Sequence, residues 1–239
     1  MEYQKLVDFY HGQYQPQNMR ELIDILTDVS QRQVHGDRDN DVWEDDVLIR
    51  DNSDLKKAQI RRGDLNCHCR YVSQTMVELF KDVGIEARMT EWTSRTGITG
   101  DARHNTFETY FDGQYVHADV DIAVIFMLNG GYFSSMDLKI GFDEGTIDPT
   151  VIHRLFEGKV LDENYHLTKH IRRVYQDNDF LFEWHRRMAD SLMIGVDICL
   201  GNTPEDDIEF IRRNIIDHKR KKVKFLTLEE FRKKYYSQC

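Results

Sequence analysis

One stretch of the chain, residues 63 to 88, leads from a polar turn through two cysteines directly into an amphipathic helix. Its apolar residues recur at the i, i+4, i+7, i+8, i+11 spacing of a helix that is buried on one face. Gly84 follows the last of them, where a helix end favours a residue that accepts positive φ. Cys69 therefore lies in the first turn, where free amides and the positive end of the helix dipole favour a thiolate. The apolar residues of this face are Val72, Met76, Leu79, Phe80 and Val83.

Length and composition predict one large globular domain, or a core with an appendage. The chain has 239 residues, of which 40% are hydrophobic and 11% aromatic. No window reaches the roughly 18 apolar residues of a membrane span, and the first eight residues contain no apolar segment of a signal peptide. Four cysteines in a chain of this size do not form the pattern of a disulfide framework. We therefore expect a cytoplasmic protein.

The charge distribution excludes some classes of partner. The formal net charge of −10 argues against general binding to nucleic acid or to anionic membranes. The basic run at residues 218–224 is interpreted as the solvated end of a helix and the loop after it. Asp37, Asp39 and Asp41 have the spacing that starts a calcium loop, but the glycine and glutamate required further along are absent, so a solvated acidic loop is expected.

Residues 86–93 alternate as a strand does, and residues 104–122 indicate a hairpin about the turn Asp112-Gly113. If Phe111 pairs with Gln114, the numbers of paired residues sum to 225. Because strand side chains repeat with a period of two, this register places three polar residues on one face. They are His104, Asp119 and Asp121.

The remaining segments are predicted mainly as helices. An N-terminal helix begins after Asn18, which has Glu21 three residues later as in a capping box. Another helix is expected from Asp148-Pro149 to about residue 157, and Thr227-Leu-Glu-Glu230 is a capping box for the last helix. We predict an α+β fold with a core at residues 1–125 and a mainly helical extension at residues 126–239 packed on it.

Three side chains together indicate nucleophilic catalysis. Alone, a cysteine is usually a buried apolar residue, and a strand histidine or post-hairpin aspartate is usually structural. Cys69 at a helix start, with His104 and Asp119 on one face of a nearby hairpin, supplies a nucleophile, a base and a group that orients the base.

These residues lie in two phrases that resemble the transglutaminase-like superfamily of papain-like cysteine enzymes. Gly84-Ile-Glu-Ala-Arg88 begins 15 residues after Cys69, as in the Cys block of that family. The segment His104-Asn-Thr-Phe-Glu108-Thr-Tyr110, followed by Asp112-Gly113, Tyr115 and Asp119, is similar to its His block. The resemblance implies a core in which the nucleophile helix packs on an antiparallel sheet, with Cys69 as nucleophile, His104 as base and acid, and Asp119 as orienter.

The sequence departs from the family pattern in three places. Asn66-Cys67-His68 stands where a glycine usually precedes the cysteine, so Cys67 is a rival nucleophile. Thr106 occupies the usual tryptophan position, and no residue stands out as the side-chain oxyanion donor, for which Trp43 and Gln59 are the candidates. Arylamine acetyltransferases share the triad, but the chain lacks their Arg-Gly-Gly-x-Cys signature.

The expected activity is acyl transfer through a thioester, most simply hydrolysis of an amide by a peptidase-like or amidase-like hydrolase. A transamidating transglutaminase and a non-catalytic binding or scaffold module are the alternatives. The run Cys67-His68-Cys69 invites a zinc interpretation, but its spacing is short and the chain offers no second pair of cysteines. We therefore expect no metal and no cofactor.

Overall fold

A computed structural model describes residues 1–35, 42–44, 47–49, 65–94, 103–157, 174, 176–201 and 224–237. Its largest element is a nine-stranded sheet in the order β10-β8-β7-β6-β5-β11-β12-β13, with β9 beside β8. Neighbouring strands are antiparallel except the parallel pair β12–β13. The strands are β5 Ala87–Thr93, β6 Arg103–Phe111, β7 Gln114–Asp119, β8 Val124–Leu128, β9 Gly131–Tyr132, β10 Ile152–Arg154, β11 Ser191–Ile194, β12 Asp197–Cys199 and β13 Lys224–Leu226.

Two small sheets and the helices complete the described elements. Strand β1 (Gln33–His35) pairs in parallel with β4 (Leu65–Cys67), and β2 (Val42–Glu44) pairs with β3 (Val47–Ile49). Helices together with a mostly antiparallel sheet confirm the α+β prediction. None of the helices in the described part of the chain has the length and apolar character needed to cross a bilayer. The helices are α1 Tyr3–Tyr10, α2 Met19–Arg32, α4 Cys69–Asp82, α5 Ser135–Glu144, α7 Asn178–Met188, α9 Leu228–Tyr235 and the short η1 Pro149–Val151.

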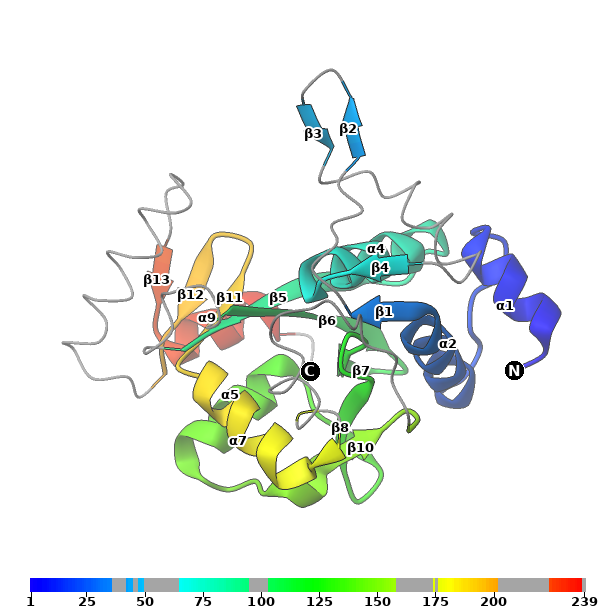
Figure 1. Cartoon of the computed structure of the whole chain (residues 1–239). Helices are drawn as coiled ribbons and strands as arrows, with labels where there is room; N and C mark the ends of the chain where they lie inside the picture. Colours follow the sequence, from blue (N-terminus) through cyan, green and yellow to red (C-terminus); the bar gives the residue numbers. More distant parts are fainter. Residues whose placement is uncertain are drawn as a thin grey trace.

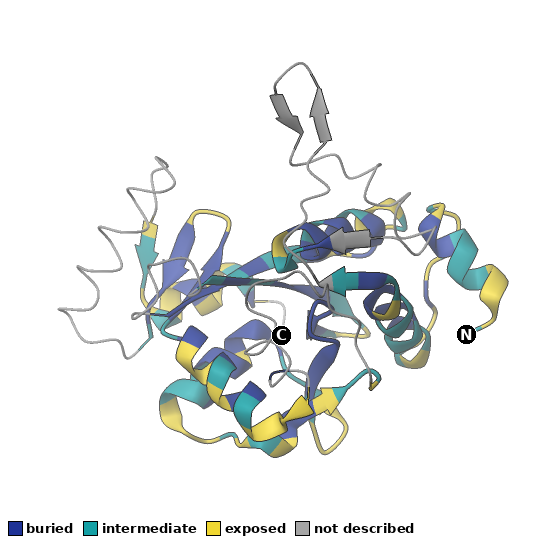
Figure 2. Ribbon diagram, in the orientation of Figure 1, coloured by how far each residue is buried: buried dark blue, intermediate teal, exposed yellow. Residues whose placement is uncertain are grey.

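Helices cover both faces of the large sheet. Figure 1 shows α4 on one side of the sheet and α5 and α7 on the other. One hydrophobic cluster joins α1, α2 and α4 to the side chains on the first face, including Phe107, Val116 and Ala118. A second cluster joins α5, α7 and α9 to Trp92 and Phe126 on the opposite face. The strands between the helices are consequently buried on both sides (Figure 2).

The predicted helix after the cysteines is confirmed as α4. Its apolar face is buried, and Gly84 has a φ of +77° two residues after the helix ends. The hairpin register is confirmed as well, since Phe111 pairs with Gln114 and Phe107 with Ala118. Asn18 accepts a hydrogen bond from the Glu21 amide, and the capping box of Thr227 and Glu230 is complete.

The part of the chain after residue 125 contains strands that were not predicted. Strands β10 to β13 belong to the same sheet as β5 to β8, so the described portion of this segment adds strands to the core sheet as well as the helices α5, α7 and α9. Asp148 and Pro149 start only the single turn η1, because Ile152 to Arg154 pair with β8 instead of continuing a helix. The helix α1 was not predicted. The acidic loop at residues 37–41, the helix expected after Thr203 and most of the basic run lie outside the described residues.

A buried ion pair connects the sheet to the helices below it. Glu108 on β6 is fully buried, and its carboxylate accepts hydrogen bonds from Arg88 Nε at 2.6 Å and from the Ser135 amide at 2.9 Å. Tyr236 after α9 donates its hydroxyl to the same carboxylate at 2.8 Å. The Arg88 guanidinium stacks 4.2 Å from the Tyr115 ring and donates to the Tyr235 carbonyl. β5, β6, α5 and α9 therefore converge on one carboxylate.

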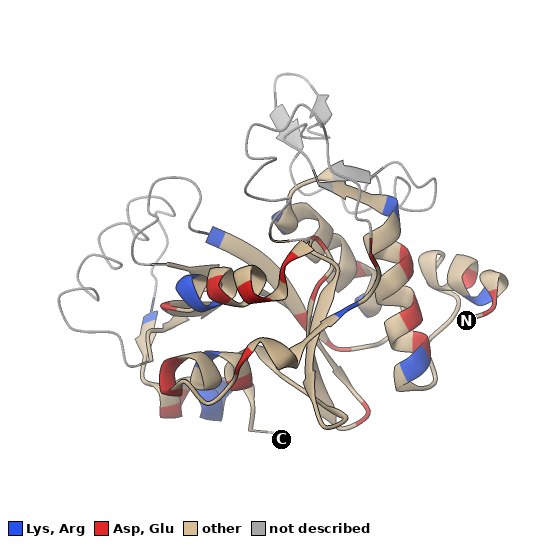
Figure 3. Cartoon of the chain, turned by 60° about the horizontal axis from the view of Figure 1, so that its bottom comes forward, with Lys and Arg blue, Asp and Glu red and all other residues tan. Residues whose placement is uncertain are grey.

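Glu108→Gln tests how strongly this carboxylate holds the layers together. The substitution keeps the shape but leaves the Arg88 charge without its partner, a change that typically costs about 3–5 kcal/mol at a buried pair. We expect the free energy of unfolding, measured by urea denaturation, to fall by that amount. Figure 3 shows that Asp and Glu as well as Lys and Arg lie along the helices. The matched control is Glu183→Gln in the exposed Glu183–Arg186 pair of α7, where at most about 1 kcal/mol is expected. Equal losses in the two variants would contradict the role given to Glu108.

Candidate active site

Cys69 is the first residue of α4, and β4 immediately precedes it through His68. The side chain is half-buried, unlike Cys67 and Cys199, which are both fully buried. All three are free thiols. The Tyr71 and Val72 amides bond to the His68 carbonyl, whereas the Cys69 amide, as the first of the helix, has no carbonyl one turn earlier in the helix to bond to. Helix geometry thus gives Cys69 a fixed position and neighbouring hydrogen-bond donors.

His104 and Asp119 form a buried pair. His104 is the second residue of β6 and is 4% exposed, and Asp119 ends β7 and is 1% exposed. The ring nitrogen Nε2 lies 2.5 Å from Asp119 Oδ2, and the second carboxylate oxygen accepts a hydrogen bond from the Ile122 amide at 3.1 Å. The carboxylate is therefore held by its own turn, and it in turn fixes the orientation of the imidazole.

The sulfur of Cys69, a ring nitrogen of His104 and a carboxylate oxygen of Asp121 all lie within 4.8 Å of one another. Because Nε2 of His104 is bonded to Asp119, the nitrogen that faces this cluster is Nδ1. Gln33 donates its amide Nε2 to Asp121 Oδ1 at 2.7 Å and to the Cys67 carbonyl at 2.8 Å. Through Gln33, the end of α2 is joined to both the strand before the cysteine and the turn after the hairpin.

Neighbouring charges decide the protonation of His104. Burial by itself would lower its pKa, but the Asp119 carboxylate and the Cys69 sulfur oppose burial and raise the pKa well above 6.5. The imidazole is therefore held as the cation near neutral pH.

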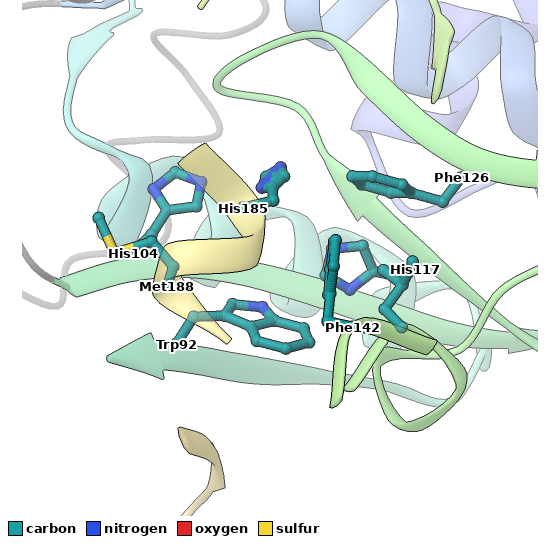
Figure 4. Close-up of a pocket in the computed structure, with 8 residues that line it drawn as sticks. Trp92, His104, His117, Phe126, Phe142, His185 and Met188 are labelled. Carbon is teal, nitrogen blue, oxygen red and sulfur yellow. The ribbon is translucent and has the colours of Figure 1, made fainter. Parts of the chain in front are cut away.

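Helix α7, on the face of the sheet opposite α4, packs against the His104–Asp119 pair. The Trp184 ring meets the His104 ring edge-on at a centroid distance of 4.7 Å, and His185 Nε2 lies 3.6 Å from Asp119 Oδ2. That His185 nitrogen is buried and makes no hydrogen bond. Beside it is a cavity of about 10 Å³, around which Figure 4 shows His104 from β6, His117 from β7 and His185 from α7. A cavity of this size holds about one water molecule.

His117 and His185 behave oppositely to His104. Burial lowers the pKa of His117 to about 3 and that of His185 well below 6.5, and the charge of His104 acts in the same direction.

These pKa shifts make the stability of the fold depend on pH. Because its pKa is raised, His104 stabilises the fold most below its unfolded pKa of about 6.5, and this contribution is lost as pH rises through its folded pKa. His117 and His185 act in the reverse sense. The folded protein keeps them neutral, so they oppose folding increasingly as pH falls below about 6.5, where the unfolded chain takes up their protons.

The structure brings Cys69, His104 and Asp119 together, as the sequence predicted, although the catalytic roles of these residues are still predictions. The rival nucleophile Cys67 is fully buried on β4. The cluster of Cys69, His104 and Asp121 includes neither Cys67 nor His68. The side chains of Trp43 and Gln59 lie outside the described residues.

Sequence reasoning missed three residues of the site. Gln33, directly after α2, follows the buried Val29 by four positions and so continues the buried face of the helix. A polar residue at such a position was the signal that could have identified it. Trp184 and His185 gave none, because only the packing of α7 brings them to the hairpin.

Comparisons with known proteins give little further information. No protein-family model matches the chain, and no curated protein matches it. A solved structure described as the crystal structure of a TGase is 18% identical, with a TM-score of 0.31. The alignment covers 59% of this chain, which spans about a third (33%) of the length of that protein.

The three buried histidines should be distinguishable by NMR titration of their imidazole nitrogens. Between about pH 5 and pH 8, where an unperturbed histidine titrates, we expect His104 to stay charged while His117 and His185 stay neutral. Asp119→Asn removes the nearest negative charge, so burial should then lower the pKa of His104. Asp148→Asn, an exposed capping residue of η1, is the control and should leave this pKa unchanged. A His104 that titrates normally would contradict the ion-pair description.

Proposed function

We propose that the protein is a cysteine-dependent acyl-transfer enzyme of the transglutaminase-like type, and that it hydrolyses an amide. The observation that carries the proposal is the arrangement of Cys69 at the start of α4 with His104, whose Nε2 is fixed 2.5 Å from Asp119. The sequence resemblance in the Cys and His blocks supports the same assignment. The substrate class is an amide or a related acyl donor.

In the first half of the reaction, the Cys69 thiolate attacks the carbonyl carbon and forms a carbon–sulfur bond. The carbonyl π electrons move to oxygen, and the amide of Cys69 at the start of α4 donates a hydrogen bond to this oxyanion. The protonated His104 then transfers its Nδ1 proton to the leaving nitrogen as the carbon–nitrogen bond breaks, a role typically worth roughly 10²–10⁴-fold in rate. The products are a free amine and a thioester on Cys69.

In the second half, neutral His104 removes a proton from water while the water oxygen attacks the thioester. Collapse of this intermediate releases the carboxylic acid and restores the thiolate and the imidazolium, so the cycle closes without any other reactant. Asp119 keeps the ring in one orientation and stabilises its charge throughout. An amine in place of water would give transamidation. We favour hydrolysis because water needs no acceptor site.

A non-catalytic binding module is the second candidate. The enclosure of His104 by Trp184 and the nearly complete burial of the His104–Asp119 pair favour it, since a packed pair also stabilises a fold. The two candidates differ in one property. A catalytic Cys69 must form an acyl intermediate that depends on His104, whereas a binding module needs none.

Acylation by p-nitrophenyl acetate, followed residue by residue with mass spectrometry, tests the proposal. We expect acetyl transfer to Cys69, no such adduct in Cys69→Ala, and slower acetylation in His104→Ala because the imidazolium no longer stabilises the thiolate. Cys67→Ala is the matched control and should keep the activity.

Two results would reject the assignment. Acetylation of Cys67 in place of Cys69 would move the nucleophile to β4. Acetylation of Cys69 at the same rate with and without His104 would favour the binding module.

A further inference from the structure

We propose that Cys69, His104 and Asp121 form a binding site for one Zn²⁺ ion. The mechanism above uses the first two residues but gives no task to Asp121, which nevertheless places a carboxylate oxygen within 4.8 Å of both. The site is inferred from the donor atoms alone. Its regulatory consequence rests on the proposed function.

The donor set fits zinc in chemistry and in spacing. A thiolate, an imidazole nitrogen and a carboxylate oxygen are the three protein ligand types of Zn²⁺, with bonds of about 2.0–2.3 Å. Around a tetrahedral ion such bonds place the donors roughly 3.3–3.8 Å apart. The three donor atoms lie within 4.8 Å of one another, so binding requires them to approach by at most about 1–1.5 Å. Three protein ligands leave the fourth position for water or a substrate.

The surrounding hydrogen bonds are those of a built metal site. A metal-bound histidine usually donates its other ring nitrogen to a carboxylate, which fixes the tautomer and the ring orientation. His104 does so, since Nε2 bonds to Asp119 Oδ2 at 2.5 Å while Nδ1 faces the cluster. Gln33 likewise donates to Oδ1 of Asp121 at 2.7 Å, so a residue outside the donor cluster orients this carboxylate as well.

The expected consequence is reversible silencing of acyl transfer. An ion bound to the Cys69 sulfur occupies the electron pair needed for attack, and an ion bound to Nδ1 displaces to water the proton that His104 would otherwise deliver to the leaving group. Free Zn²⁺ would then switch off the enzyme, and a chelator would restore it.

Binding is measured by competition of Zn²⁺ with a chelating dye and by the absorption spectrum of the Co²⁺-loaded protein. One equivalent should bind, with the thiolate-to-cobalt charge-transfer band and visible bands of a tetrahedral ion. Cys69→Ala should abolish the charge-transfer band. Asp121→Asn and His104→Ala should weaken binding by more than the roughly 10–100-fold typical of an outer partner such as Asp119.

The controls are His153→Ala and Asp148→Asn, two exposed positions that should bind as the wild type does. The inference is overturned if the wild type gives no charge-transfer band, or if Asp121→Asn binds as tightly as the wild type. Acetylation of Cys69 with and without Zn²⁺ separates the two proposals. Metal binding without acetylation in chelator keeps the site and rejects the enzyme, whereas acetylation that saturating Zn²⁺ leaves unchanged keeps the enzyme and rejects the site.

Discussion

Glu108 sits in the middle of β6 with no exposure to solvent, and an ionised carboxylate there is stable only when its oxygens are paired. One guanidinium, one backbone amide and one tyrosine hydroxyl pair with them, and these groups come from β5, α5 and the end of α9. A shift of β6 by one residue would turn this carboxylate into the apolar cluster under α4. The register that also positions His104, four residues earlier on the same face, is therefore specified by electrostatics as well as by apolar burial.

The polar face of β6 explains how the site tolerates burial. Between His104 and Glu108, Thr106 shares hydrogen bonds with Thr90 at 2.6 Å and with the Trp92 indole at 3.0 Å. Every second residue of this strand segment thus has a partner in a water-poor layer, where such bonds are strong and a missing one is costly. Of the three histidines in that layer, His104 alone has a ring nitrogen within hydrogen-bond distance of a carboxylate. Equal burial consequently gives opposite protonation states.

Local patterns allowed much of this arrangement to be predicted from the sequence. The helix stripe after Cys69, the hairpin turn at Asp112 and the two N-caps each depend on residues a few positions apart, and all were found. The helix expected after Pro149 was wrong because strand pairing with β8 outweighed a good N-terminal signal. Arg88 and Glu108 were noted as parts of the two phrases that resemble the transglutaminase-like superfamily, but the ion pair between them was not predicted. This ion pair, like the contacts of Gln33 and α7 at the site, forms by packing between different segments of the chain. The spacing of apolar residues within one segment does not predict such contacts.

The link between the sheet and the residues after α9 has a consequence for the order of folding. Arg88 donates to the carbonyl of Tyr235, 147 positions later, and Glu108 accepts from Tyr236, 128 positions later. On the ribosome, the strands that carry the histidine and its carboxylate emerge long before these partners exist. Contacts of such wide separation slow folding, because the loop entropy must be spent before the contact forms. A nascent chain that has already made its nucleophile helix and hairpin would thus still lack the Tyr235 carbonyl and the Tyr236 hydroxyl that complete the hydrogen bonds of the buried Arg88–Glu108 pair, and this pair would be fully hydrogen-bonded only after synthesis reaches the residues that follow the last helix.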